Sequence, residues 1–388
     1  YRTVIDNERA LKYGGKCVEA IPHVRDEILR RIEAAAEHNG SKISVIEIGG
    51  TVGDFQNALF IDAARVMKMK HPNDVVFVMV SYLPVPGTLG EMKTKPTQSA
   101  IRELNSYGVQ PDFIIARSTT AIDEKRKEKL ATSCNVLPER VISAPDVESI
   151  YEVPLNFEKD EFGDHLLDCL GLSEKKKPDL REREKFVDGL KTSEPVLKIG
   201  IVGKYFDTGD YILSDAYLSV IEALKFSGAA IGAKPKIDWI NAKEFQNGEG
   251  VEKLAQYDGI IVPGGFGETA IEGKIHAIKF ERENKIPYFG LCYGMQLAVI
   301  EVARHVLGIK EAHTVEINPT TAHPIVDVMP EQKDLIAEGN YGGTMRLGVY
   351  TAELGKGTIA REAYGKDKVE ERHRHRYEIN PEYIEQIE

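Results

Sequence analysis

The sequence predicts an α/β fold made of two doubly wound, parallel-sheet domains. Apolar segments of strand length, such as the run Val-Val-Phe-Val-Met-Val at 75–80, alternate with segments of helical periodicity. The runs lack polar alternation, as expected for parallel strands that are covered on both faces. The alternation stops at a Lys- and Glu-rich stretch and then resumes, so we expect one sheet on each side of that stretch. A chain of 388 residues is long enough for two or three domains with full cores.

The first half alternates between four helical and four strand patterns. Helices are expected over residues 22–38, 60–69, 97–104 and 123–133. Buried strands are expected over residues 43–48, 75–80, 113–116 and 140–144. Functional loops in such a fold follow the carboxyl ends of the strands.

The second half repeats the alternation after a linker. Residues 173–195 are expected to be an interdomain linker with room for one polar helix. Strands are expected over residues 198–203, 236–240 and 259–262, and helices over a segment that Ser214 can cap and over 271–284. After Ala303 the pattern loosens into loops and short strands.

Composition limits the possible partners and compartment. The net charge of -11 argues against a general nucleic-acid binder, whose binding surface is basic. The four cysteines, at 17, 134, 169 and 292, form no Cys-x-x-Cys pair, which suits a reducing compartment. No apolar run has the length of a membrane span and no signal peptide is visible. We therefore expect a cytoplasmic protein that binds neither nucleic acid nor membrane.

The stretch 286–299 has the pattern of a nucleophile elbow with cysteine as the nucleophile. Cys292 lies between an apolar run, 287–291, and a helical stripe that begins at Met295, and Gly290 and Gly294 flank it. The glycines allow a sharp turn and a close approach of substrate. The positive end of the following helix is expected to lower the thiol pKa. A small buried cysteine on a strand is the alternative, but the position between strand and helix favours the nucleophile.

A glycine-rich loop precedes this elbow by one strand. The sequence Pro-Gly-Gly-Phe-Gly at 263–267 follows an apolar strand and leaves backbone N–H groups available to a ligand. Beside a thiolate, such N–H groups can form an oxyanion hole. Alone the motif could be an ordinary loop; together with the elbow it favours acyl transfer.

Several motifs together resemble the CTP synthase family, whose second domain is a class I glutamine amidotransferase. In the second half they are the loop 263–267, Gly-Leu-Cys-Tyr-Gly-Met-Gln at 290–296, Gly-Gly-Thr-Met-Arg-Leu-Gly at 342–348 and Arg-His-Arg-His-Arg-Tyr-Glu at 372–378. In the first half they are Glu-Ile-Gly-Gly-Thr-Val-Gly-Asp at 47–54 and Gly-Glu-Met-Lys-Thr-Lys-Pro-Thr-Gln at 90–98. The resemblance implies a P-loop-NTPase-like synthetase domain over 1–172 and a flavodoxin-like amidotransferase domain over 196–388.

The resemblance implies an ATP-dependent amination of UTP to CTP with ammonia from glutamine, in pyrimidine nucleotide biosynthesis. Cys292 matches the glutaminase nucleophile, and Glu316 and Arg376 match the residues that hold the amino and carboxylate ends of glutamine. The other matched glutamine-binding and oxyanion positions are Gly265, Tyr293, Gly294, Met295 and Gln296.

The resemblance places nucleotide sites in the first domain. Glu47 matches a Mg²⁺ ligand that acts with ATP, since this hard cation prefers carboxylate oxygen. The matched UTP and CTP positions are Asp54, Phe55, Gln56, Lys93, Thr94, Lys95, Pro96, Thr97, Gln98 and Lys129, and the matched ATP positions are Pro145, Asp146 and Val147. GTP as an activator, CTP as an inhibitor and a homotetramer are also implied.

The sequence departs from the family in several places. Gln56 stands where the family usually has Glu, and Tyr293 where it often has Leu. No Gly-x-x-x-x-Gly-Lys-[Ser/Thr] loop and no Gln-Phe-His-Pro-Glu motif occur, although the family carries both, and the second supplies its catalytic His and Glu. We therefore expect a chain truncated at both ends that makes no CTP by itself.

Two alternative functions remain at this point. The chain could be a non-catalytic nucleotide-binding or assembly module that uses the same folds. It could also be another amidotransferase such as GMP synthetase, but the motif at 93–98 argues against that alternative.

Overall fold

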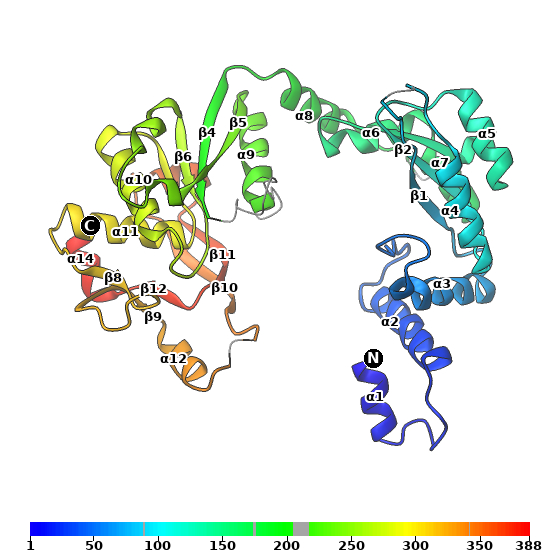
Figure 1. The fold of residues 1–388 in the computed structure, drawn as a ribbon, viewed down its shortest axis with the longest axis horizontal. Helices are drawn as coiled ribbons and strands as arrows, with labels where there is room; N and C mark the ends of the chain where they lie inside the picture. Colours follow the sequence, from blue (N-terminus) through cyan, green and yellow to red (C-terminus); the bar gives the residue numbers. More distant parts are fainter. Residues whose placement is uncertain (88–89, 174–175, 205–216, 341) are drawn as a thin grey trace. The chain divides into compact units, whose positions relative to one another are not determined.

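The computed structural model describes residues 1–87, 90–173, 176–204, 217–340 and 342–388. The chain divides into two compact units, Tyr1–Val187 (unit 1) and Asp188–Glu388 (unit 2), each with a parallel sheet and helices (Figure 1). The predicted α/β class is confirmed. The predicted helix cap at Ser214 lies outside the described residues.

Unit 1 is built on a parallel sheet with the strand order β1 (Val78–Tyr82), β2 (Phe113–Ser118) and β3 (Val141–Pro145). Alternate residues of β2 point to opposite faces of the sheet. Ile114 packs in one core cluster with residues of α4 and α5, and Ile115 packs in another with residues of α6 and α7. Helices thus cover both faces, which explains why the strand sequences lack polar alternation.

The helices of unit 1 surround this sheet and continue into an N-terminal extension. They are α1 (Arg2–Arg9), α2 (Arg25–His38), α3 (Ala58–Lys70), α4 (Lys95–Ser106), α5 (Glu124–Cys134), α6 (Val153–Lys159) and α7 (Phe162–Cys169), with α8 (Arg181–Thr192) crossing the division between the units. A short π-helical turn, Ala20–Val24, precedes α2, so the helix predicted from residue 22 is interrupted at its start. Asp123 caps α5 by accepting a hydrogen bond from the backbone N–H of Arg126.

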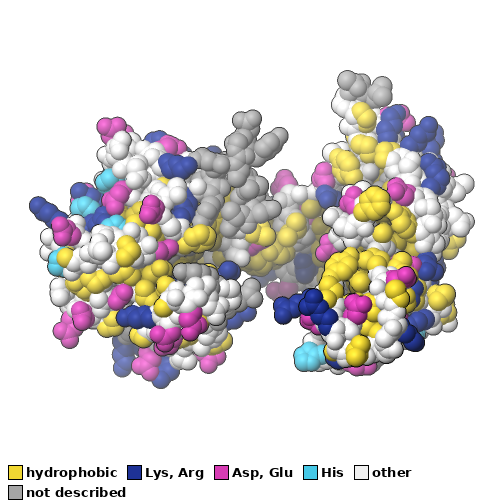
Figure 2. Space-filling model, turned by 60° about the horizontal axis from the view of Figure 1, so that its bottom comes forward, with side chains coloured by type: hydrophobic (Ala, Val, Ile, Leu, Met, Phe, Trp, Pro, Cys, Tyr) yellow, Lys and Arg dark blue, Asp and Glu magenta, His cyan; other side chains and the backbone are white. Residues whose placement is uncertain are grey.

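The strand predicted over residues 43–48 is wrong. This segment has no strand assignment, and its apolar side chains are exposed, with Val45 95% and Ile46 50% accessible. An apolar sequence can form a buried strand only where a neighbouring strand supplies hydrogen bonds and helices cover its faces. Among the described residues, β1 pairs only with β2 and begins at Val78, three residues later than the predicted strand at 75–80. Apolar side chains accordingly gather on the face of unit 1 seen in Figure 2.

Unit 2 is built on a four-stranded parallel sheet with the order β5 (Lys234–Asn241), β4 (Val196–Gly203), β6 (Gly259–Val262) and β7 (Tyr288–Gly290). One face packs against α10 (Ile271–Asn284) and α11 (Tyr293–His305), where Ile275 and Leu297 are fully buried. Residues of the other face, such as Ile201, pack in a cluster with Leu224 of α9 (Leu218–Ile231). β6 and α10 have the bounds predicted from the sequence.

The rest of unit 2 adds two smaller sheets. β8 (Ala312–Thr314), β9 (His323–Val328) and β12 (Tyr377–Ile379) form one of them, with β9 in the middle. β10 (Arg346–Glu353) and β11 (Lys368–Arg374) form an antiparallel hairpin. The short helices are α12 (Pro330–Ala337), α13 (Ile359–Tyr364) and α14 (Ile384–Ile387). Within the described ranges, no helix has the length and apolar character needed to cross a membrane.

Candidate active site

Cys292 lies in a strained turn between β7 and α11. It is the residue before the first turn of α11, with φ of 51° and ψ of -103°, a positive-φ conformation that is rare for a residue with a side chain. The predicted sharp turn is therefore present. Gly294 is needed for packing, because a Cβ atom there would overlap the carbonyl oxygen of Val262 at the end of β6. The first turn of α11 thus lies directly against the sheet.

The predicted lowering of the thiol pKa is wrong for the free protein. The Cys292 side chain is exposed, yet the surrounding loops withdraw the sulfur partly from water, and this desolvation raises the thiol pKa. The backbone N–H of Tyr293 lowers the pKa and the Glu316 carboxylate raises it. The helix terminus therefore acts in the expected direction but is outweighed.

The glycine-rich loop 263–267 lies beside the thiol. A Cβ atom on Gly264 would come within 3.5 Å of the Cys292 Cβ atom, an ordinary contact distance. At Gly265 it would come within 3.9 Å of the Tyr293 ring. Gly267 donates its backbone N–H to Glu316 Oε1 at 2.9 Å. The loop therefore connects the cysteine to the carboxylate that the sequence assigned to substrate binding.

Not every predicted backbone donor is available to a ligand. The N–H of Gly294 donates to the Leu291 carbonyl oxygen at 2.9 Å, and the N–H of Gln296 donates to the Cys292 carbonyl oxygen at 3.1 Å. These bonds belong to the turn and to the helix that follows it. The N–H of Tyr293, in contrast, interacts with the thiol itself.

Glu316 is a half-buried carboxylate that follows β8. Burial raises its pKa, while the Gly267 N–H and the Lys204 ammonium lower it. Its charge also raises the pKa of Cys292, so the two side chains lie near each other. A carboxylate in this position suits the ammonium group of an amino acid.

Arg376 lies in the turn between β11 and β12. Its side chain is buried, and its Nη1 donates to Gln332 Oε1 at 3.1 Å. The next residue, Tyr377, accepts a hydrogen bond from Gln296 Nε2 at 2.9 Å through its carbonyl oxygen. The Gln296 side chain thus connects the helix after the nucleophile to the turn that carries the guanidinium.

Two lysines near the site were missed in the sequence. Lys204 directly follows β4 and donates through Nζ to the carbonyl oxygens of Phe266 and Gly267. Lys274 of α10 is fully buried, with its Nζ 5.7 Å from the centroid of the Tyr293 ring, and burial followed by the Lys204 charge lowers its pKa to about 8. The only sequence signal for Lys204 was its position at the carboxyl end of a predicted strand.

In unit 1, Lys93 follows β1 and pairs with Glu91, and the charge of Lys129 on α5 also acts on this carboxylate. Lys93 Nζ forms an ion pair with Glu91 Oε2 at 2.6 Å. This pair lowers the pKa of Glu91, and the charges of Arg126 and Lys129 on α5 lower it further. Four charged side chains thus gather after β1, next to α5.

The motif predicted as a UTP loop, Lys93 to Gln98, is only partly a loop. Helix α4 starts at Lys95, with Thr94 as its cap residue and Pro96 in its first turn. Thr97 is fully buried and its Oγ1 lies 2.8 Å from Ser81 Oγ of β1. Thr97 therefore anchors the helix, and Gln98 donates to Thr94 Oγ1 at 3.2 Å.

The remaining predicted nucleotide residues lie in two places. Pro145 ends β3, and Val147 follows Asp146, whose Oδ1 accepts from Arg117 Nη2 at 3.1 Å across the carboxyl ends of β2 and β3. A second group, Glu47, Asp54, Phe55 and Gln56, lies in the N-terminal extension, where Asp54 Oδ2 accepts from the Thr51 N–H at 2.9 Å and Phe55 is 98% exposed. The contacts of the described residues do not join these two groups.

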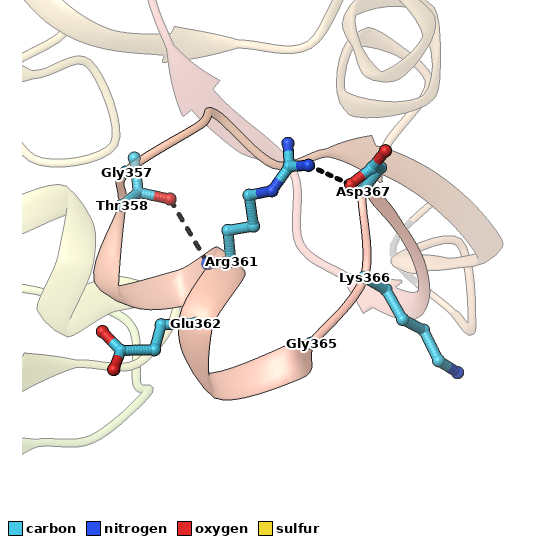
Figure 3. A pocket seen from close by; sticks show the side chains of 7 residues that line it. All are labelled: Gly357, Thr358, Arg361, Glu362, Gly365, Lys366 and Asp367. Carbon is cyan, nitrogen blue, oxygen red and sulfur yellow. Dashed lines mark hydrogen bonds and ion pairs between the residues drawn. The ribbon is translucent and has the colours of Figure 1, made fainter.

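A separate hollow lies in the connection between β10 and β11. It has a volume of about 420 Å³, and Figure 3 shows Arg361 turned toward Asp367, with which it forms an ion pair. Its lining consists of Gly357, Thr358, Arg361, Glu362, Gly365, Lys366 and Asp367. None of the predicted site residues belongs to it.

Separate family models match the two halves of the chain, and they are consistent with each other. A model of the CTP synthase N-terminus matches residues 1–172, and a model of class-I glutamine amidotransferases matches residues 212–387. The CTP synthase of Pyrococcus abyssi is 49% identical over 389 residues, covering 100% of this chain and 70% of that protein. That of Methanocaldococcus jannaschii is 47% identical over 395 residues, covering 100% and 71%.

One solved structure is also similar. The glutaminase domain of Trypanosoma brucei CTPS with bound acivicin is 35% identical, with a TM-score of 0.44 over 49% of this chain and 71% of that chain.

Proposed function

The chain belongs to the CTP synthase family, and on that premise we propose which of its residues carry each half of the reaction. Members of this family are glutamine-hydrolysing ligases that use ATP to aminate UTP in pyrimidine nucleotide biosynthesis. The observation that carries the proposal is the elbow: Cys292 in a strained turn, with the loop 263–267 and Glu316 beside it.

Cys292 is the glutaminase nucleophile. Its thiolate attacks the side-chain amide carbon of glutamine, the C–N bond breaks, and the amide nitrogen takes up the proton released from the thiol and leaves as ammonia. A water molecule then hydrolyses the thioester and releases glutamate and the thiol. The N–H groups of Tyr293 and Gly265 are proposed to stabilise the oxyanion, because the first already interacts with the sulfur and the second lies in the loop that packs against Tyr293.

Glu316 and Arg376 hold the two charged ends of glutamine. The carboxylate of Glu316 pairs with the substrate ammonium, and the guanidinium of Arg376 binds its carboxylate. The proximity of Glu316 to Cys292 and the link from Gln296 to the turn with Arg376 support this assignment. Gly294 and Met295, as part of the first turn of α11, shape the remaining wall.

Unit 1 binds the nucleotides. Lys93 and Lys129 are proposed to contact the UTP phosphates, with Thr94, Lys95, Pro96, Thr97 and Gln98 forming the helix start behind them. The segment Pro145, Asp146 and Val147 lies along ATP. CTP binds as an inhibitor through Asp54, Phe55 and Gln56. The charged side chains gathered at the carboxyl edge of the sheet support the first of these assignments.

The chemistry of Mg²⁺ fits a single carboxylate such as Glu47. This ion keeps several waters and binds proteins through one or two carboxylates together with substrate phosphates. Among the described residues no group of three His, Cys, Asp or Glu side chains could hold a metal. We propose that Mg²⁺ binds together with ATP, where it would supply charge neutralisation at the phosphates.

Further family properties are proposed for the whole protein. These are GTP as an activator, a homotetramer and a cytoplasmic location. We propose residues 1–172 as the synthetase domain, 173–195 as the linker and 196–388 as the amidotransferase domain.

The test is to supply the two nitrogen sources separately. In the complete enzyme, Cys292→Ala should abolish CTP formation from glutamine and leave CTP formation from ammonia unchanged, because the two reactions use different units. Cys17→Ala, which removes another exposed thiol, is the control. Equal loss with both nitrogen sources would contradict this division of roles.

A further inference from the structure

Gln332 of α12 makes a two-sided contact that includes Arg376. The amide of Gln332 is 2% exposed. Its Oε1 accepts from Arg376 Nη1 at 3.1 Å, and its Nε2 donates to the Thr344 carbonyl oxygen at 3.1 Å. Acceptor and donor are therefore both used, and the reverse amide orientation would turn N–H groups toward the guanidinium.

The main chain supports the same contact. Met329, the cap residue of α12, donates its N–H to the Arg376 carbonyl oxygen at 2.9 Å, and the Gln332 N–H returns to the Met329 carbonyl oxygen at 2.9 Å. Pro330 occupies the first turn, where its missing N–H costs nothing. The start of α12 is thus tied to Arg376 through both the backbone and a buried side chain.

A neutral partner is the important feature of this contact. A buried arginine is commonly paired with a carboxylate, which neutralises its charge. The amide oxygen of Gln332 restricts the orientation of the guanidinium and adds no charge beside it. A guanidinium that is held in one plane loses less side-chain entropy when it binds a carboxylate.

We propose that Gln332 is a positioning residue that makes the glutaminase selective for substrates with an α-carboxylate. This inference rests on the proposed role of Arg376 in binding that carboxylate. Gln332 does not touch substrate; it holds Arg376 in the orientation that substrate needs and connects it to the segment that contains Thr344.

The test compares two substrates that differ only in the α-carboxylate, glutamine and γ-aminobutyramide. In Gln332→Met, which keeps the volume but removes both hydrogen bonds, kcat/KM for glutamine should fall about ten-fold, mainly through KM. kcat/KM for γ-aminobutyramide should stay unchanged, so the preference for glutamine falls by the same factor. Gln332→Glu should reduce the preference as well, because its carboxylate neutralises Arg376 and competes with the substrate.

Reference variants separate the failure of this inference from the failure of the proposed function. Arg376→Met should reduce the preference for glutamine over γ-aminobutyramide by a larger factor than either Gln332 variant does. The thermal transition of unit 2 reports whether these variants fold, and Gln256→Met, at an exposed glutamine, is the matched control. Suppose that Arg376→Met reduces the preference for glutamine over γ-aminobutyramide. If both Gln332 variants then leave this preference unchanged, or lower kcat/KM equally for both substrates, Gln332 has no positioning role. If Arg376→Met leaves the preference for glutamine unchanged, the proposed role of Arg376 is wrong and the inference about Gln332 is wrong with it.

Discussion

At the scale of single residues, the reactivity of Cys292 depends on its neighbours more than on the helix that follows it. Desolvation and the Glu316 carboxylate raise the thiol pKa, and the Tyr293 N–H opposes them. A substrate ammonium placed against Glu316 would offset the carboxylate charge. The thiol should therefore become more reactive when glutamine is bound, which protects the free enzyme from adventitious alkylation and oxidation.

This competition predicts the effect of Glu316→Gln on the free enzyme. Removal of the negative charge favours the thiolate, so the thiol pKa should fall and alkylation of Cys292 by iodoacetamide at neutral pH should become several-fold faster. The measurement is the alkylation rate against pH, followed at Cys292 by mass spectrometry. Glu311→Gln, at an exposed position, should change nothing. If the midpoint of the alkylation rate against pH is the same in Glu316→Gln as in the parent, Glu316 does not influence the thiol.

Lys93 allows a second prediction at this scale. Lys93→Ala should weaken the apparent affinity for UTP about ten- to a hundred-fold, through loss of a charge-assisted phosphate contact. The loss also leaves the Glu91 carboxylate, now paired at 2.6 Å, unneutralised near the phosphates. UTP saturation with ammonia as the nitrogen source measures the effect, and Lys125→Ala on the exposed face of α5 is the control. A normal saturation curve would mean that Lys93 is only a surface residue.

At the scale of elements, α10 is unusual because it contains a buried carboxyl group near the candidate active site. Glu281 is fully buried, neither of its carboxylate oxygens has a hydrogen-bond partner among the described residues, and burial raises its pKa from 4.5 to about 9. Burial raises the pKa of the nearby Tyr288 hydroxyl, and Glu281 raises it further; this hydroxyl donates to the Gly294 carbonyl oxygen at 2.7 Å. The helix therefore contains a neutral acid directly behind the turn of Cys292.

The position of Glu281 predicts how stability depends on pH. Between its unfolded and folded pKa values the folded protein keeps a proton that the unfolded chain has released. The contribution of Glu281 to the free energy of unfolding is therefore fully present below its unfolded pKa. It falls as pH rises toward the folded pKa, by up to about 1.4 kcal/mol per pH unit. Glu281→Gln should flatten this decline between about pH 5 and pH 8.

The measurement for Glu281 is thermal unfolding of unit 2 across that pH range. Glu283→Gln, two residues along the same helix but exposed, should keep the decline of the parent. A decline that is equally steep in Glu281→Gln would show that another group causes it.

At the scale of the whole molecule, each unit has its own hydrophobic cores. Leu130 is fully buried in a cluster of unit 1, and Leu297 is fully buried in a cluster of unit 2. Separate cores are expected to unfold in separate transitions. The same independence underlies the proposal that the ammonia-dependent reaction survives the loss of Cys292.

A matched pair of core variants tests this independence. Leu130→Ala and Leu297→Ala each remove about 2–5 kcal/mol of stability, so each should lower one thermal transition by roughly 5–20 °C and leave the other in place. Differential scanning calorimetry of both variants is the measurement. If either variant moved both transitions together, the two cores would form a single cooperative system.

The sequence alone determined the features that depend on local pattern. The helix over Ile271–Asn284, the strand Gly259–Val262 and the turn at Cys292 follow from periodicity, chain direction and the placement of glycines, so their bounds were predictable. The motifs also identified the family, because they combine several short segments that an unrelated α/β protein has no reason to carry together.

Only the tertiary structure decided the features that depend on distant neighbours. The apolar segment 43–48 is exposed because a strand needs a partner that its own sequence does not provide. The pKa of Cys292 rises because the fold surrounds it with loops and places Glu316 beside it. The contact between Gln332 and Arg376 joins residues 44 positions apart, and nothing in the local sequence of either predicts it. Local pattern determines which elements form, whereas electrostatics and buried hydrogen bonds depend on which of these elements meet.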